Sequence, residues 1–132
     1  MSGADKGRPA IRVVMMPRDT NPHGTIFGGV LLSYIDQAGA IGAREHTPHR
    51  CVTVVVDRVE FQEPVYVGDV LSFYTTLQRA GRTSLTMQIS VEAERFSNPR
   101  EIVPVTKALI TYVAIDADRR PVPHGLGPPP AS

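Results

Sequence analysis

The feature that most restricts the fold of this chain is a single long helical segment at residues 29–45. Its apolar side chains cover far more than one stripe of the helix, and they are Val30, Leu31, Tyr34, Ile35, Ala38 and Ile41. A helix that is apolar nearly all round is normally buried. At 1.5 Å per residue it would be about 25 Å long, so the rest of the chain has to supply an equally long cover.

The cover is predicted to be a β-sheet, because the remaining segments have the period of two that strands show. Residues 11–16 are a short apolar run that Pro17 stops, and residues 51–61 are β-branched and long enough for a central strand. Residues 71–78 and 85–91 alternate apolar with polar side chains across a turn at 79–82, which indicates an antiparallel hairpin with one dry face. A last strand ends near residue 115.

One helix followed by consecutive strands is typical of an α+β domain with an antiparallel sheet. The economical arrangement is a single domain in which a strongly curved sheet wraps around the one long buried helix. We expect this domain at residues 11–117. Residues 1–10 are small, charged and polar, and residues 118–132 are rich in Pro and Gly, so both ends are predicted to be disordered.

Composition restricts the partners of the chain. Its 132 residues fit one domain, and its net charge of +1 with scattered basic residues excludes nucleic acid as an expected partner. No apolar run approaches the ~20 residues that cross a bilayer, and no signal peptide is recognisable, so no membrane is expected. Cys51 is the one cysteine, which excludes an internal disulfide. Together these features favour a cytoplasmic protein.

No metal site is predicted. His46 and His49 are spaced as HxxH at the end of the helix, but no third ligand of a suitable type stands near them in the sequence. Cys51 lies in a β-branched run with no feature that would make it a reactive thiolate. We therefore expect Cys51 to be a core residue of its strand.

Residues 19–43, DTNPHGTIFGGVLLSYIDQAGAIGA, contain Asn21, Gly24, the pair Gly28-Gly29, Asp36 and the pair Ala38-Gly39 in that order. This stretch resembles the signature of the hot-dog acyl-CoA hydrolases, which include brain-type cytosolic enzymes and single-domain bacterial relatives. The segments VTVVVDRVEFQEPVYVGDV, GRTS and TKALITYVAID also look like that family, so the resemblance spans nearly all of residues 11–117.

The resemblance implies a hot-dog fold and a hydrolase whose substrate is an acyl-CoA thioester. The products would be a free acid and coenzyme A, and no cofactor would be required. The resemblance also implies a homodimer, assembled into a hexamer as a trimer of dimers. A long edge strand that pairs with its twin would be a physical reason for the dimer.

Asp36 is the carboxylate within the apolar helix. An ionised carboxylate that is buried without a partner is costly, so it must be paired, reached by water or protonated. A purely structural Asp would cap a strand or bond a neighbouring subunit. The resemblance implies instead that Asp36 is catalytic, as a base that takes a proton from water or as a nucleophile that attacks the thioester carbonyl. The sequence leaves both routes open.

Gly28 and Gly29 stand where the backbone enters the helix, and the first N–H groups of a helix have no partner within it. These amides can bind the oxyanion of a thioester intermediate, or the glycines can merely shape the turn and allow close packing. Asn21 can be a simple turn residue before Pro22. The resemblance implies that Asn21 lines the active site and is supplied by the subunit opposite the one that carries the acid. His23 could join Asn21 there, but as a His beside a proline it is expected on the surface.

Coenzyme A carries phosphates, and the turn between the two alternating strands offers groups that bind them. These are the guanidinium groups, hydroxyls and backbone amides of Arg79, Gly81, Arg82, Thr83 and Ser84. Arg58 and Lys107 are further candidates. Arginines at hairpin tips are often only solvated, and the related proteins usually have a small residue or Thr in place of Arg82.

Two other functions remain open at this point. The first is a hydratase or dehydratase of acyl chains, but those enzymes use a His near a carboxylate, and the predicted helix contains no His. The second is a non-catalytic hot-dog module that binds acyl-CoA as a regulatory ligand. A carboxylate at residue 36 argues against the second function, and release of thiol from acyl-CoA would distinguish them.

Overall fold

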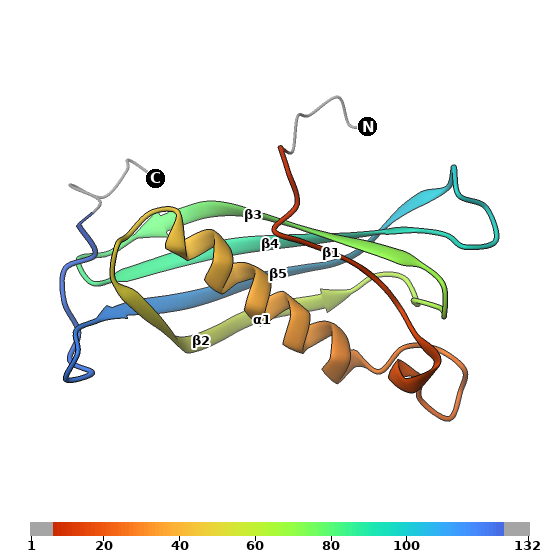
Figure 1. Ribbon diagram of the computed structural model, residues 1–132, viewed down its shortest axis with the longest axis horizontal. Helices are drawn as coiled ribbons and strands as arrows, with labels where there is room; N and C mark the ends of the chain where they lie inside the picture. Colours follow the sequence, from red (N-terminus) through yellow and green to blue (C-terminus); the bar gives the residue numbers. More distant parts are fainter. Residues whose placement is uncertain (1–6, 126–132) are drawn as a thin grey trace.

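The computed structural model describes residues 7–125, in which one helix packs on a five-stranded antiparallel sheet (Figure 1). In chain order the elements are β1 (Ile11–Val14), a short 3-10 turn η1 (Pro17–Asp19), α1 (Gly28–Arg44), β2 (Arg50–Phe61), β3 (Val70–Ala80), β4 (Ser84–Glu94) and β5 (Ile102–Ile115). This order is the predicted one. The helix begins one residue earlier than the sequence pattern indicates, and it ends one residue before the predicted limit.

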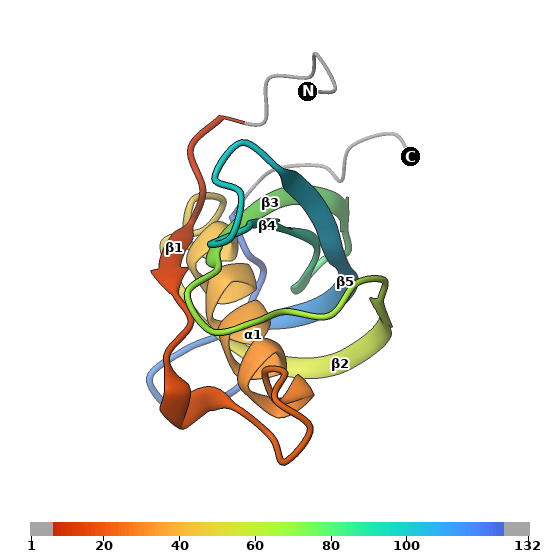
Figure 2. The same ribbon diagram turned by 90° about the vertical axis from the view of Figure 1, so that its right-hand side faces the viewer.

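The sheet has the strand order β1-β3-β4-β5-β2, and every neighbouring pair is antiparallel. Figure 2, which looks along the sheet from one end, shows the strands curling around α1 as a half-barrel. The predicted α+β domain with a curved sheet around one long helix is therefore confirmed. Its core lies between α1 and the concave face of the sheet, and the largest fully buried side chains there include Tyr112, Phe73, Met15 and Ile35.

The prediction that residues 51–61 form a central strand is wrong. β2 is an edge strand whose neighbour in the sheet is β5. The reason is that β3, β4 and β5 pair consecutively, so only the outer side of β5 is left for β2. The β-branched side chains that made the strand look central are consequently accessible, and Val54, Val55 and Val56 are 51%, 48% and 45% exposed.

The helix is buried on one face. The residues of that face are Leu31, Ile35, Ala38, Gly39, Gly42 and Ala43. Two glycines allow the close approach, because a Cβ at Gly42 would lie 2.8 Å from Cβ of Thr75, and a Cβ at Gly39 would overlap the Tyr112 side chain. Leu32 and Ile41, on the other side of the helix, are exposed within this chain.

The structure differs from the predicted disordered tail at residues 118–125. Pro121 forms a bridge with Ile115, the amide of Val122 donates to the carbonyl of Ala114, and His124 is buried. Prolines prevent a helix or a central strand, but they allow an extended segment to pack on the end of the sheet. At the other end, the amide of Ala10 donates to the carbonyl of Phe73. Residues 1–6 and 126–132, the remainder of both predicted tails, lie outside the described residues.

Among residues 7–125, no helix is both long enough and apolar enough to cross a lipid bilayer.

Candidate active site

The Asp36 carboxylate lies between the helix and two strands of the sheet. The hydroxyl of Thr53 in β2 donates to Oδ1 of Asp36 at 2.8 Å. The hydroxyl of Tyr112 in β5 contacts the same Oδ1 at 3.1 Å and the backbone carbonyl oxygen of Asp36 at 2.8 Å. Asp36 is half-buried. It is therefore paired with hydroxyl groups and still accessible from outside.

Strand register explains why these two hydroxyls meet at one carboxylate. Thr53 and Tyr112 are directly opposite each other in the antiparallel pair of β2 and β5. Opposite residues of such a pair project from the same face of the sheet, here the face that carries the helix. A register irregularity follows between Thr53 and Val55. A β-bulge bends its strand and re-aims the side chains next to it.

The two oxygens of the carboxylate have different surroundings. Oδ1 accepts from both hydroxyls, whereas no residue in the range 7–125 hydrogen bonds to Oδ2. A carboxylate held by one oxygen keeps lone pairs on the other for a water molecule or an electrophilic carbon. This arrangement suits either general-base or nucleophilic chemistry.

Burial raises the pKa of Tyr112, and the negative charge of Asp36 and their mutual hydrogen bond raise that pKa further. Tyr112 therefore remains a neutral phenol, and its hydroxyl donates a hydrogen bond to Asp36. This assigns it the role of a hydrogen-bond donor and not that of a base.

Gly28 and Gly29 are the first residues of α1. The following amides of Val30 and Leu31 both donate to the carbonyl of Phe27, but no described residue accepts a hydrogen bond from the amides of Gly28 and Gly29. A Cβ at Gly29 would meet no atom within 4 Å, so this end of the helix is open. The amides point away from Asp36, which is eight residues after Gly28 and seven residues after Gly29, or about 10–12 Å along the axis.

The side chain of Asn21 is occupied within its own turn. Its Oδ1 accepts from the amides of His23 and Thr25 at 2.8 Å and 3.2 Å, and its Nδ2 donates to the Thr25 hydroxyl at 2.9 Å. All of these hydrogen bonds join Asn21 to residues of its own turn, which is typical of Asn before Pro. Within one chain the structure therefore does not bring Asn21 to Asp36, and His23 is exposed.

The turn that contains Arg79, Gly81, Arg82, Thr83 and Ser84 lies at the opposite end of the helix from Gly28 (Figure 1). The amide of Gly81 is used inside the turn, where it donates to the carbonyl of Ser84. The carbonyls of Gly81 and Arg82 contact the ring and the amide of His124. The side chains of Arg79 and Arg82 are exposed. This turn and the start of the helix do not form one site within a single chain.

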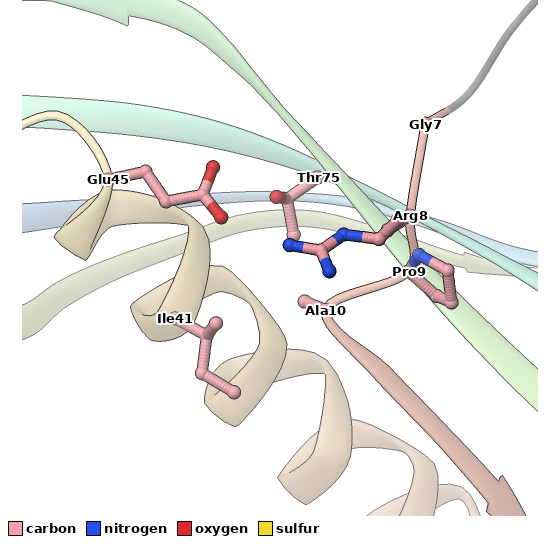
Figure 3. Close-up of a pocket in the computed structure, with 7 residues that line it drawn as sticks. All are labelled: Gly7, Arg8, Pro9, Ala10, Ile41, Glu45 and Thr75. Atoms are coloured by element: carbon pink, nitrogen blue, oxygen red, sulfur yellow. The ribbon is translucent and has the colours of Figure 1, made fainter.

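Among the pockets on the described part of the chain, two open ones bear on the candidate residues. The larger, of about 630 Å³, lies on the side of α1 away from Asp36, between the chain at residues 7–10, Ile41, Glu45 and Thr75 (Figure 3). The smaller, of about 210 Å³, contains Arg58 and Lys107 with Glu60 and Gln88 beside them. Arg58 lies 3.8 Å from Glu60, so part of its charge is compensated. Neither pocket includes Asp36.

Metal ligands do not gather anywhere in the described residues 7–125, where no three His, Cys, Asp or Glu side chains could hold one ion. Cys51 is partly buried against the core, and burial raises the pKa of its thiol. His46 and His49 lie in the segment between the end of α1 and the start of β2, as predicted from the sequence.

The sequence analysis missed Thr53 and Tyr112 as site residues. Both stand in β-branched or alternating runs, where a hydroxyl looks like any other strand side chain. The one available signal is their alternation, which places each on the concave face of its strand. Only the register of β2 against β5 shows that they face the same helical residue.

Comparison with known proteins gives a match of residues 23–95 to the thioesterase superfamily. An uncharacterized acyl-CoA thioester hydrolase of Zymomonas mobilis is 47% identical over 119 residues, which cover 89% of this chain and 78% of that protein. The acyl-CoA thioester hydrolase YciA of Salmonella typhimurium is 39% identical over 125 residues, 93% of this chain and 94% of that protein. The crystal structure of a hexameric hotdog fold thioesterase of Campylobacter jejuni has a TM-score of 0.87 at 44% identity, and covers 92% and 93% of the two chains.

Proposed function

The chain belongs to the thioesterase superfamily, and we propose that it hydrolyses acyl-CoA thioesters with Asp36 as its catalytic carboxylate. The relatives named as acyl-CoA thioester hydrolases support the substrate class, since they match this chain over most of both lengths. The observation that carries the assignment of Asp36 is the difference between its oxygens. Oδ1 is held by two hydroxyls, and Oδ2 has no bonded partner among residues 7–125.

In the general-base route, Oδ2 of Asp36 takes a proton from a water molecule while the water oxygen attacks the thioester carbonyl carbon. The tetrahedral intermediate then breaks down to the free acid and the coenzyme A thiolate. The thiolate takes up a proton. In the nucleophilic route, Oδ2 attacks the carbonyl carbon and the coenzyme A thiolate leaves and takes up a proton. Water then hydrolyses the resulting anhydride, which releases the free acid and restores the Asp36 carboxylate. Both routes need an ionised carboxylate in a fixed orientation, which the hydrogen bonds to Oδ1 support.

We assign the oxyanion site to the amides of Gly28 and Gly29 of a second copy of the chain. Within one chain these amides point away from Asp36 and lie about 10 Å from it along the helix axis. A single thioester carbonyl group could therefore not contact the amides and the Asp36 carboxylate of the same chain. At the start of a helix they combine free N–H groups with the positive end of the dipole. Asn21 lies in the loop before this helix, so it would reach the same site from the same subunit.

A homodimer with two such shared sites is the assembly we propose, built further into a hexamer. The exposed β2 edge with its accessible valines supports the dimer, because an unpaired apolar edge strand favours pairing with a second strand. The hexameric Campylobacter jejuni thioesterase supports the larger assembly. The exposed Arg79 and Arg82, with Gly81, Thr83 and Ser84, would bind the phosphates of coenzyme A that extend from a neighbouring subunit's site.

The competing function is a module that binds acyl-CoA without hydrolysing it. Release of thiol from acetyl-, butyryl- and palmitoyl-CoA distinguishes the two, because a pure binding module releases none. The panel also reports the preferred acyl chain length.

The test of Asp36 is the variant Asp36→Asn measured on the best substrate of that panel. Asn keeps the shape and one acceptor oxygen but has no negative charge, so kcat should fall at least about a hundredfold. KM should change little, because the lost interaction belongs to the transition state. Asp118→Asn, in an exposed turn after β5, is the matched control and should keep wild-type kcat. Near-normal kcat in Asp36→Asn would refute the assignment.

A further inference from the structure

We propose that Tyr112 is a positioning residue for Asp36, and that Gly39 is the helical residue whose missing side chain lets Tyr112 reach it. This inference rests on the proposed function of Asp36. It adds a residue of the central strand β5 and a glycine of α1 to the machinery of the site.

The contacts of Tyr112 define its role. Its hydroxyl contacts both the backbone carbonyl oxygen and Oδ1 of Asp36, at 2.8 Å and 3.1 Å. A phenol has one proton, so these two acceptors share it. A group that joins the backbone and the side chain of one residue restrains the rotation between them. The second oxygen of Asp36 is thereby held at a constant angle to the helix.

Tyr112 is a firmer anchor than Thr53. Its side chain is 0% exposed within the core, and β5 has a neighbouring strand on each side. Thr53 is exposed and belongs to the edge strand β2, next to a register irregularity. The orientation of Asp36 therefore depends on Tyr112 even when the edge strand moves.

Gly39 makes the contact possible. It follows Asp36 by three residues, which places it one turn further along the same side of the helix. A Cβ at this position would overlap the Tyr112 hydroxyl oxygen and would lie 2.9 Å from the ring carbon Cζ. A glycine inside a helix lowers stability relative to alanine. At Gly39 the lower stability is offset by space for the Tyr112 hydroxyl, which reaches the backbone carbonyl oxygen of Asp36.

The charge state of Tyr112 agrees with this role. Burial and the neighbouring carboxylate both raise its pKa, so the hydroxyl keeps its proton throughout the neutral range. As a neutral phenol, Tyr112 donates a hydrogen bond to the carboxylate, so it orients Asp36 and does not act as a base.

The variant Tyr112→Phe tests the proposal, because it removes the hydroxyl and keeps the buried ring. We expect kcat to fall about tenfold, as for the loss of a hydrogen bond to a charged group, with KM changed less than about twofold. Tyr66→Phe is the matched control, since Tyr66 stacks on Arg95 away from Asp36. It should leave both quantities unchanged.

Gly39→Ala provides the second arm. It should lower kcat in the wild-type background by displacing the hydroxyl, and it should lower kcat less in the Tyr112→Phe background. Such non-additivity is the result expected of residues that act through one contact. Equal effects in both backgrounds would refute the link between Gly39 and the hydroxyl.

The outcomes separate this inference from the proposed function. A wild-type protein that hydrolyses acyl-CoA, an inactive Asp36→Asn variant and a Tyr112→Phe variant with unchanged kcat would overturn this inference alone. A lower melting temperature of Tyr112→Phe with unchanged kcat would also overturn it, since packing alone would then explain Tyr112. No thiol release by the wild type, or full activity of Asp36→Asn, would overturn both proposals.

Discussion

At the scale of single residues, the carboxylate of Asp36 receives two hydroxyl donors on Oδ1, one from β2 and one from β5. Two donors on one oxygen distribute the task of orientation between an exposed edge strand and a buried central strand. Thr53 makes the shorter contact with Oδ1, at 2.8 Å. Because Thr53 is exposed, water can replace part of its contribution, and its effect should be smaller than the effect of losing the carboxylate itself.

Thr53→Val measures that contribution. Valine has nearly the same shape and an equal preference for strands, so β2 should be retained. We expect kcat to fall by about three- to tenfold, equivalent to roughly 1 kcal/mol for one exposed hydrogen bond. Steady-state hydrolysis of the preferred acyl-CoA is the measurement. Thr111→Val is the control, because the Thr111 hydroxyl bonds to Thr86 and not to Asp36. Equal losses in both variants would indicate a general effect on the sheet.

At the scale of elements, β2 combines two functions that conflict in a single chain. Its concave side supplies Thr53 to the site, and three consecutive valines of this edge strand are exposed. Exposed apolar edge strands promote association, and proteins that must remain monomeric usually place charges or prolines there. Asp57 and Arg58 follow directly on the same strand, but the run of three valines itself carries no charge, which agrees with pairing of this part of the edge in a dimer.

Val55→Lys places a charge in the middle of the β2 edge. A buried lysine without a partner destabilises an interface, so the variant should shift the protein towards smaller species in sedimentation velocity. Its activity should fall with the shift if each site draws on two chains. Val14→Lys on the opposite edge strand β1 is the matched control, since Val14 is 47% exposed and has the same chemistry. Unchanged sedimentation of Val55→Lys would place the subunit contact elsewhere.

At the scale of the whole molecule, one chain does not complete the proposed site. Asp36 lies in the middle of α1, whereas the free amides of Gly28 and Gly29 lie at its start and point outwards. The turn at Arg79–Ser84 lies beyond the other end of the helix (Figure 1). Only a second copy can bring a helix start to an Asp36 carboxylate, so catalysis and assembly are expected to be coupled.

Co-expression of two impaired variants, Asn21→Ala and Asp36→Asn, tests this coupling. We expect Asn21→Ala to reduce activity less than Asp36→Asn does, partly because Asn21 also closes its own turn. In a mixed dimer of the two, one site has both mutations and the other has Asp36 and Asn21 intact. Hydrolysis by the purified mixture should therefore exceed the average of the two separate variants. Activity equal to that average would indicate that each site belongs to one chain.

The sequence by itself determined the elements of this protein, because helix and strand periodicity is encoded by neighbouring residues. The limits of α1, the β3–β4 hairpin and the curved α+β sheet follow from apolar spacing, and Asp36 is conspicuous as the charge within an apolar helix. The tertiary structure alone decided that β2 is an edge strand and that residues 118–125 pack on the sheet. It also decided that Thr53 and Tyr112, 17 and 76 residues away from Asp36, share one carboxylate oxygen. Those contacts depend on strand order, register and the space beside Gly39, and no local pattern contains that information.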